Sequence, residues 1–184
     1  MKSHITIGRR LTCLLLFSVA IMVVVLDHAA NVSATRANNG FKSTKLAVGR
    51  FGEIDVFDHF LSPSQSEDKH INSVWLSSQK TNGSSDLYVQ SNVFQPGAST
   101  GWHTHPGHSL IIVIAGTVTA YEGDDPDCNP RVYTQGMGFV DPGGDHVHIL
   151  RNEGDVVAKT IAVQLLPAAA THRIDVADPA NCHF

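Results

Sequence analysis

Short apolar runs separated by turn residues make up most of the chain beyond its first 45 residues. In residues 86–94, Leu87, Val89 and Val93 share one parity, which predicts a half-buried strand because successive strand side chains point to opposite faces. Residues 110–114 are rich in β-branched side chains and predict a second strand. No helical period stands out, so the pattern favours an all-β barrel or sandwich.

Turn residues punctuate these runs at close spacing. Gln95-Pro96-Gly97 closes the first run, and Gly116 ends the second. Gly, Asp, Asn and Pro fill a loop at 122–130, and a longer apolar strand follows at 156–166. The chain has 184 residues, which favours a single domain.

The N-terminus has the pattern of an export signal. Lys2, Arg9 and Arg10 precede an uncharged apolar run, 11–26, and Val32-Ser33-Ala34 offers small residues for cleavage. The apolar run stops short of the about 20 residues that a membrane span needs. We therefore expect a cleaved signal peptide in preference to an uncleaved membrane anchor.

The chain is predicted to consist of three consecutive segments. Residues 1–34 are assigned to the signal peptide, 35–45 to a flexible leader without periodicity, and 46–184 to the β domain. The protein is expected to be secreted or periplasmic, with no membrane contact beyond the signal segment.

Charge argues against nucleic acid as a partner. The formal net charge is −4, and no basic block occurs along the chain. Phosphate binding needs clustered Lys and Arg. We expect a small molecule to be the partner instead.

Two cysteines lie beyond the signal segment, Cys128 and Cys182. They lack the C-x-x-C spacing of zinc or redox sites. In an oxidising compartment they most simply form a disulfide. The alternative is two independent, small buried residues.

Two His-x-His pairs carry the candidate chemistry: His103 with His105, and His146 with His148. Residues two apart on a strand point to the same face, so each pair can direct two imidazoles at one point. Imidazole suits several divalent transition metals. The pairs therefore predict a metal site inside a barrel, against the alternative of scattered surface or core histidines.

These segments resemble the two motifs of the cupin superfamily. The first motif, G-x5-H-x-H-x3,4-E-x6-G, is matched by Gly97, His103, His105 and Gly116, with Ser109 at the glutamate position. The second, G-x5-P-x-G-x2-H-x3-N, is matched with one extra residue by Gly136, Pro142, Gly144, His148 and Asn152. The resemblance implies a small single-domain cupin, a double-stranded β-helix or jelly roll, with its motif core at 97–152.

Two departures from the motifs affect the expected ligands. Because Ser109 replaces the glutamate, we expect no carboxylate from that position and a neutral ligand set of His103, His105 and His148. Such a site would favour anionic ligands. The extra residue before His148 leaves His146 as an alternative or fourth ligand. The ion would be one divalent transition metal: Fe, Mn, Zn, Ni or Cu.

Other polar residues are given ordinary structural roles. We expect His108 at the barrel rim and Trp102 in packing. The acidic loop, with Asp124, Asp125 and Asp127, lacks the glycine and distal glutamate of a calcium-binding EF-hand. His172 and His183 carry no spacing signal, and the direction of Arg151 is left open.

The resemblance leaves two classes of function. One is a metal-dependent enzyme, a dioxygenase, isomerase or lyase, and the other is a non-catalytic module that binds a small ligand or the metal. No catalytic residue is named beyond the ligands. A homodimer is expected by analogy with the family.

Overall fold

The computed structural model describes residues 33–61 and 74–184, so most of the predicted signal peptide lies outside the described part. Over these ranges the chain forms twelve strands and no helix. Their bounds are β1 Phe41–Phe51, β2 Asp55–Leu61, β3 Val74–Lys80, β4 Ser85–Phe94, β5 His103–Thr104, β6 Ser109–Ala115, β7 Thr117–Glu122, β8 Arg131–Thr134, β9 Gly138–Asp141, β10 His148–Arg151, β11 Ala158–Pro167 and β12 Ile174–Asp175.

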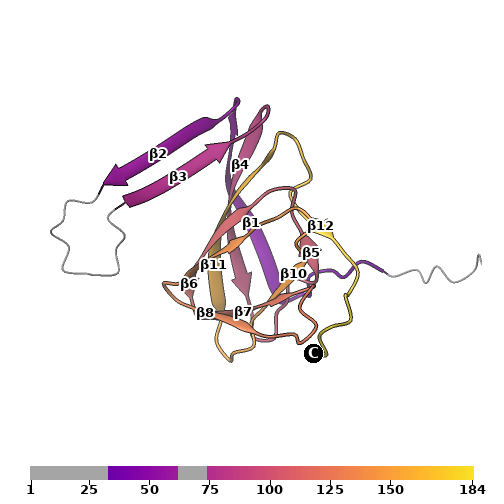
Figure 1. Ribbon diagram of the computed structural model, residues 1–184. Helices are drawn as coiled ribbons and strands as arrows, with labels where there is room; N and C mark the ends of the chain where they lie inside the picture. The colour runs from indigo at the N-terminus through magenta and orange to yellow at the C-terminus, as the bar shows by residue number, and fades with distance from the viewer. Residues whose placement is uncertain (1–32, 62–73) are drawn as a thin grey trace, which may run out of the picture. The chain divides into compact units, whose positions relative to one another are not determined.

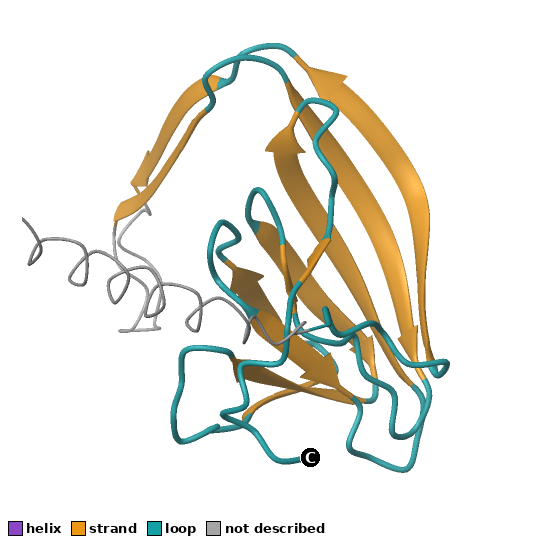
Figure 2. Ribbon diagram, turned by 90° about the vertical axis from the view of Figure 1, so that its right-hand side faces the viewer, coloured by secondary structure: helices purple, strands orange, loops and turns teal. Residues whose placement is uncertain are grey.

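Ten of these strands form two five-stranded sheets that face each other as layers (Figure 2). The first sheet has the order β1-β4-β11-β6-β9, and the second has β12-β5-β10-β7-β8. The remaining strands, β2 and β3, pair as a separate hairpin (Figure 1). The predicted all-β double-stranded β-helix is confirmed.

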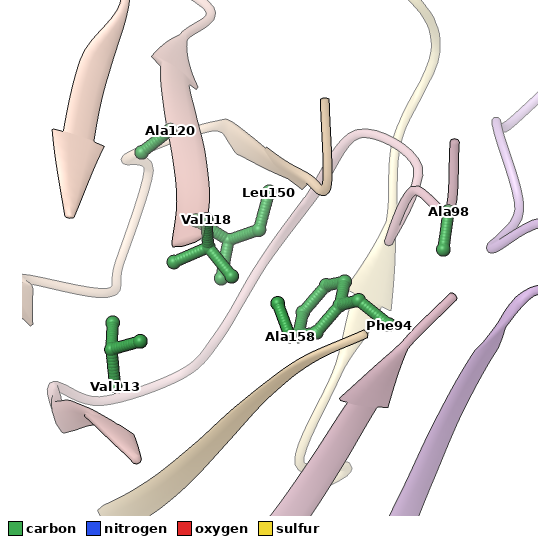
Figure 3. Close-up of a cluster of buried hydrophobic side chains, with 7 residues drawn as sticks. All are labelled: Phe94, Ala98, Val113, Val118, Ala120, Leu150 and Ala158. Atoms are coloured by element: carbon green, nitrogen blue, oxygen red, sulfur yellow. The ribbon is translucent and has the colours of Figure 1, made fainter. Parts of the chain in front are cut away.

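A hydrophobic cluster joins the two sheets (Figure 3). Phe94, Val113 and Ala158 come from the first sheet, and Val118 and Leu150 come from the second. All five side chains are buried. Because apolar burial is the main favourable term in folding, this shared core holds the two layers together.

Strand β4 buries the parity opposite to its apolar one. Asp86, Gln90 and Phe94 are buried, whereas Leu87 and Val89 on the other face are half-exposed. The half-buried strand is as predicted, but the apolar alternation marks the outer face of the sheet. On the inner face, Gln90 lines the cavity of the candidate site, whereas Asp86 pairs with Arg50.

The predicted flexible leader, 35–45, is wrong in part. Strand β1 begins at Phe41 and pairs with β4 through ten residue pairs. Upstream, the backbone N–H of Thr35 donates to the Val176 carbonyl at 2.7 Å. Sequence periodicity missed β1 because nearly all of its side chains are exposed and no apolar alternation marks it. Backbone pairing with β4, the Arg50–Asp86 ion pair and the contact of Phe41 with Phe94 hold the strand in place.

The C-terminal tail is attached to the loop that follows β7. The structure contains the Cys128–Cys182 disulfide, with a Cα–Cα distance of 5.3 Å. Beside it, the Asn181 amide donates to the carbonyls of Glu122 and Asp125, at 2.9 and 2.6 Å. The disulfide and these hydrogen bonds hold the C-terminal tail against the loop that follows β7.

Within residues 33–61 and 74–184, the structure has no helix whose length and hydropathy would let it span a membrane.

Candidate metal centre

Three histidines converge inside the barrel: His103, His105 and His148. His103 begins β5, and it pairs directly with His148 on β10. The ring centroids of His103 lie 4.3 Å from His148 and 4.9 Å from His105. Each side chain is buried, and one ring nitrogen from each lies within 4.8 Å of the others. The structure thus brings together the three residues that the motifs select.

Backbone carbonyls fix two of the three rings. Nδ1 of His103 lies 2.9 Å from the Gly101 carbonyl oxygen, and Nδ1 of His105 lies 2.5 Å from that of His172. A carbonyl can only accept, so each Nδ1 carries the proton and each Nε2 presents a lone pair. This arrangement, in which the second nitrogen is tied down, is typical of metal-binding histidines.

Burial keeps these imidazoles neutral. It lowers the pKa of His105 and lowers that of His103 well below the usual value, with nearby His148 and Arg173 adding to the effect on His103. Burial also lowers the pKa of His148 to about 4. Neutral imidazole is the form that binds metal, so the three rings are ready to act as ligands near neutral pH.

A carboxylate that sequence reasoning missed, Asp141, lies against this cluster. Its Oδ2 is 3.7 Å from Nε2 of His105, and its Oδ1 is 3.6 Å from Nδ1 of His148. Asp141 ends β9 and pairs directly with Ser109 on β6. A carboxylate is therefore present on the strand beside Ser109, next to the three histidines that the motifs select. The available signal was an Asp directly before Pro142.

The turn after β9 holds the Asp141 carboxylate in place. The backbone N–H of Gly143 donates to Asp141 Oδ1 at 2.9 Å. Gly143 has φ 68°, and a Cβ there would lie 2.2 Å from the Gly107 carbonyl oxygen. Glycine is required at this position by both the backbone conformation and the close approach.

The Asp141 carboxylate accepts hydrogen bonds from the Gly143 N–H and the Ser109 hydroxyl, but no lysine or arginine in the described ranges lies beside it. Its side chain is only 3% exposed, and the basic side chains within 4.0 Å of it in the described ranges are all histidines, His105, His146 and His148. A buried carboxylate needs a cation or a hydrogen-bond network to offset the loss of hydration. Two of these histidines are held neutral, so the donor set fits a divalent metal ion.

His146, the alternative ligand, lies in a different environment. Its Nε2 is 2.6 Å from Oε2 of Glu122, and its Nδ1 is 3.5 Å from Oδ1 of Asp141. Glu122 also contacts Arg131 at 3.1 Å. The candidate ligands form two groups that share His148: one contains His103 and His105, and the other contains Asp141 and His146.

A cavity of about 70 Å³ adjoins the three histidines. Ser109, Gln164 and Arg173 contribute to its lining. The guanidinium of Arg173 donates to the Thr100 carbonyl and to Asp175, at 2.5 and 2.6 Å, and burial lowers its pKa. The space beside the histidines thus contains one cationic side chain.

The other residues singled out in the sequence have structural positions. His108 lines a separate hollow of about 560 Å³ beside β3 and β11, which agrees with a rim location. Trp102 packs in a buried cluster with Tyr121 and Ile149. The motif residue Asn152 donates from Nδ2 to the carbonyls of Phe94 and Val156, and Arg151 lies over the Phe184 ring.

Fold and candidate site together define a cupin-type barrel with a cluster of histidines and an aspartate that could bind a metal. Residues 92–164 match the family model described as a cupin domain, and this stretch contains all three histidines and Asp141. These residues therefore form a cupin domain. No curated protein matches it.

Several solved structures are similar to part of this chain. Oxalate oxidase in complex with the substrate analogue glycolate is 24% identical over 42% of this chain and 41% of its own, with a TM-score of 0.38. A cupin-like protein from Thermotoga maritima is 24% identical over 50% of this chain and 65% of its own, with a TM-score of 0.42. DMSP lyase DddQ from Ruegeria pomeroyi is 19% identical over 48% of this chain and 42% of its own, with a TM-score of 0.41. This chain spans less than half the length of that oxalate oxidase, and none of these likenesses assigns it an activity.

Proposed function

We propose that this protein is an exported cupin that binds one divalent transition metal ion through His103, His105, His148 and Asp141. The observation that carries the proposal is the buried Asp141 carboxylate, which faces neutral imidazoles and has no lysine or arginine within 4.0 Å in the described ranges. When bound, the metal would act as a Lewis acid or an oxygen activator. Imidazole and carboxylate together suit Fe, Mn, Zn, Ni or Cu.

The same site is proposed to take a small anionic molecule. One carboxylate offsets only part of the charge of a divalent ion, so the occupied site keeps a net positive charge. Arg173 lines the cavity beside the histidines and adds a second cationic group. The cavity of about 70 Å³ has room for a molecule of a few non-hydrogen atoms. A small carboxylate fits these three features.

Binding without turnover is the second candidate, and the lining of the cavity favours it. Apart from the ligand histidines and His172, its polar lining consists of hydroxyl and amide side chains and Arg173, which is already paired with Asp175. The described lining therefore offers few groups for general acid or base catalysis. An enzyme of the dioxygenase, isomerase or lyase type would have to rely on the metal itself.

Export is proposed from the signal-like N-terminus and the disulfide. Cys128 and Cys182 are bonded in the structure, and such bonds persist mainly in oxidising compartments. The predicted cleavage after the Val32-Ser33-Ala34 stretch supports the same compartment. N-terminal sequencing of the protein from the culture medium or periplasm would test this part.

Metal analysis of matched variants tests the proposed site. Protein isolated from its native compartment should contain one equivalent of a divalent transition metal, and His105→Ala should lose most of it. His183→Ala, which changes an exposed histidine in the tail, is the control and should keep the metal. Full occupancy in the His105→Ala protein would overturn the assignment.

A further inference from the structure

A chain of hydrogen bonds crosses the whole inner face of the first sheet and ends on Asp141. Ser43 donates to Gln90 at 3.0 Å, and Gln90 donates to Gln164 at 2.5 Å. Gln164 donates to Ser109 at 3.0 Å, and Ser109 donates to Oδ2 of Asp141 at 3.2 Å. We call these five side chains the interior ladder. They lie on β1, β4, β11, β6 and β9, which is the order of the strands in the sheet.

Strand register produces this alignment. Gln164 pairs directly with Ser109, and Ser109 pairs directly with Asp141, so their side chains lie side by side on one face. Gln90 pairs with Ala162, two residues before Gln164, and therefore reaches it diagonally. All but Ser43 are buried.

The carboxylate sets the direction of every hydrogen bond in the ladder. An ionised carboxylate can only accept, so Ser109 must turn its one proton toward Asp141. The oxygen of Ser109 then accepts from the amide of Gln164, whose carbonyl accepts from Gln90 in turn. The donors therefore all point the same way, and such chains polarise one another in a low-dielectric interior.

We infer that the interior ladder is a positioning device that holds the Asp141 carboxylate in its metal-binding orientation, with Ser109, Gln164 and Gln90 as positioning residues. This inference rests on the proposed metal site. Ser109, at the position where the family motif has a ligand, acts here through the carboxylate opposite it. Oδ2 is held toward Ser109 and His105, while Oδ1 is held by the Gly143 N–H toward His148.

Loss of the ladder should weaken metal binding without removing a ligand. Partners that orient a ligand are worth about 10- to 100-fold in metal affinity. Ser109→Ala removes the donor next to Asp141, Gln164→Met removes the second link, and Gln90→Met removes the third. We expect Co²⁺ affinity to fall most for Ser109→Ala and least for Gln90→Met.

The experiment is a chelator-competition titration of Co²⁺ on the full chain, with the visible spectrum of the bound ion recorded for each variant. The spectrum reports the ligand arrangement, which a merely structural role for the ladder would leave unchanged. Thr160→Val is the matched control, because buried Thr160 accepts a hydrogen bond from Asn92, 3.1 Å long, on the same inner face but outside the ladder. It should bind Co²⁺ like the wild type, with the same spectrum.

The outcomes separate the two proposals. Wild-type affinity and spectrum in both Ser109→Ala and Gln164→Met, or an equal loss in Thr160→Val, would overturn the ladder and leave the metal site standing. A wild-type protein that binds no Co²⁺ would overturn the metal site and the ladder together. If Gln164→Met does not fold, the small change Ser109→Ala still decides the question.

Discussion

Three buried imidazoles make the stability of the metal-free protein depend on pH. Burial lowers the pKa of His103, His105 and His148 in the folded protein. The unfolded chain takes up protons near the ordinary value of about 6.5. Between that value and about 4, the unfolded state binds more protons than the folded state. The free energy of unfolding should therefore fall as the pH falls through this window.

The expected loss is measurable by chemical denaturation. The pKa of His148, about 4, corresponds on its own to about 3 kcal/mol between neutral pH and the bottom of the window. Urea titrations of the metal-free protein at several pH values would record it. The variant His148→Gln should show a flatter profile, and a wild-type stability that is constant over the window would contradict the burial argument.

Asp141 is the residue whose replacement should separate charge from shape. Asp141→Asn keeps the size of the side chain but removes one negative charge from the ligand set. Metal affinity should fall by at least about 100-fold, because losing a ligand costs more than losing its support. Small anions should bind more tightly to the remaining metal-loaded protein, since its ion is less neutralised.

The control for this change is Asp145→Asn, which alters an exposed carboxylate four residues away. It should leave both affinities at the wild-type values. If metal and anion affinities move in the same direction in Asp141→Asn, the carboxylate does not bind the ion.

The sequence predicts the three histidines but not the carboxylate. His103, His105 and His148 follow from local spacing, because residues two apart on a strand share a face. Asp141 enters the site through its pairing with Ser109, which is 32 residues away in the chain. The periodicity of one strand does not tell which residue of a distant strand pairs with it, so this neighbour and the interior ladder become visible only in the folded chain.

At the scale of elements, the disulfide should be the main restraint on the C-terminal tail. It closes a loop with a sequence separation of 54 residues. The chain-entropy estimate for such a loop is about 4 kcal/mol. The double variant Cys128→Ser, Cys182→Ser should lose stability of this order in urea denaturation, while keeping the barrel and its metal site.

Mass analysis provides the direct check on the bond. Native, unreduced protein should resist alkylation at both cysteines. Two freely alkylated thiols in that sample would contradict the prediction, whatever the stability of the double variant.

Strand positions were predictable, whereas the buried face was not always so. Apolar runs locate β6 and β11, because apolar residues predominate in both strands. In β4 the same rule selects Leu87, Val89 and Val93, although the barrel interior receives Gln90. The rule assumes that the interior is apolar, and it fails where polar side chains line a site. The prediction of a flexible leader at 35–45 failed for another reason. β1 is an edge strand with mostly exposed side chains, so no apolar pattern marks it in the sequence.

At the scale of the whole molecule, the outer face of the first sheet exposes apolar side chains. Leu110 and Ile112 on β6 are 52% and 53% exposed, and Val140 on the adjacent β9 is 61% exposed. Contiguous apolar patches on a folded surface often mark an interface. A second copy of this chain is the partner that the family resemblance predicts, and this face offers it exposed apolar side chains.

Light scattering coupled to gel filtration would test the homodimer. Ile112→Lys should shift the protein to the monomer mass. The control Asn129→Lys, at an exposed position of the loop at 122–130, should leave the dimer mass unchanged. A monomer mass for the wild-type protein at micromolar concentration would contradict the prediction and leave the metal site unaffected.

The proposed metal site places one divalent ion between the three histidines and Asp141. Anomalous X-ray diffraction from crystals of the natively loaded protein, collected at the absorption edge of the metal that elemental analysis identifies, tests it most directly. The predicted result is a single peak about 2 Å from Nε2 of His103, from Nε2 of His105, from a nitrogen of His148 and from an oxygen of Asp141. A loaded protein with no peak in contact with these groups, or with its peak only at the exposed loop of residues 124–127, would contradict the account.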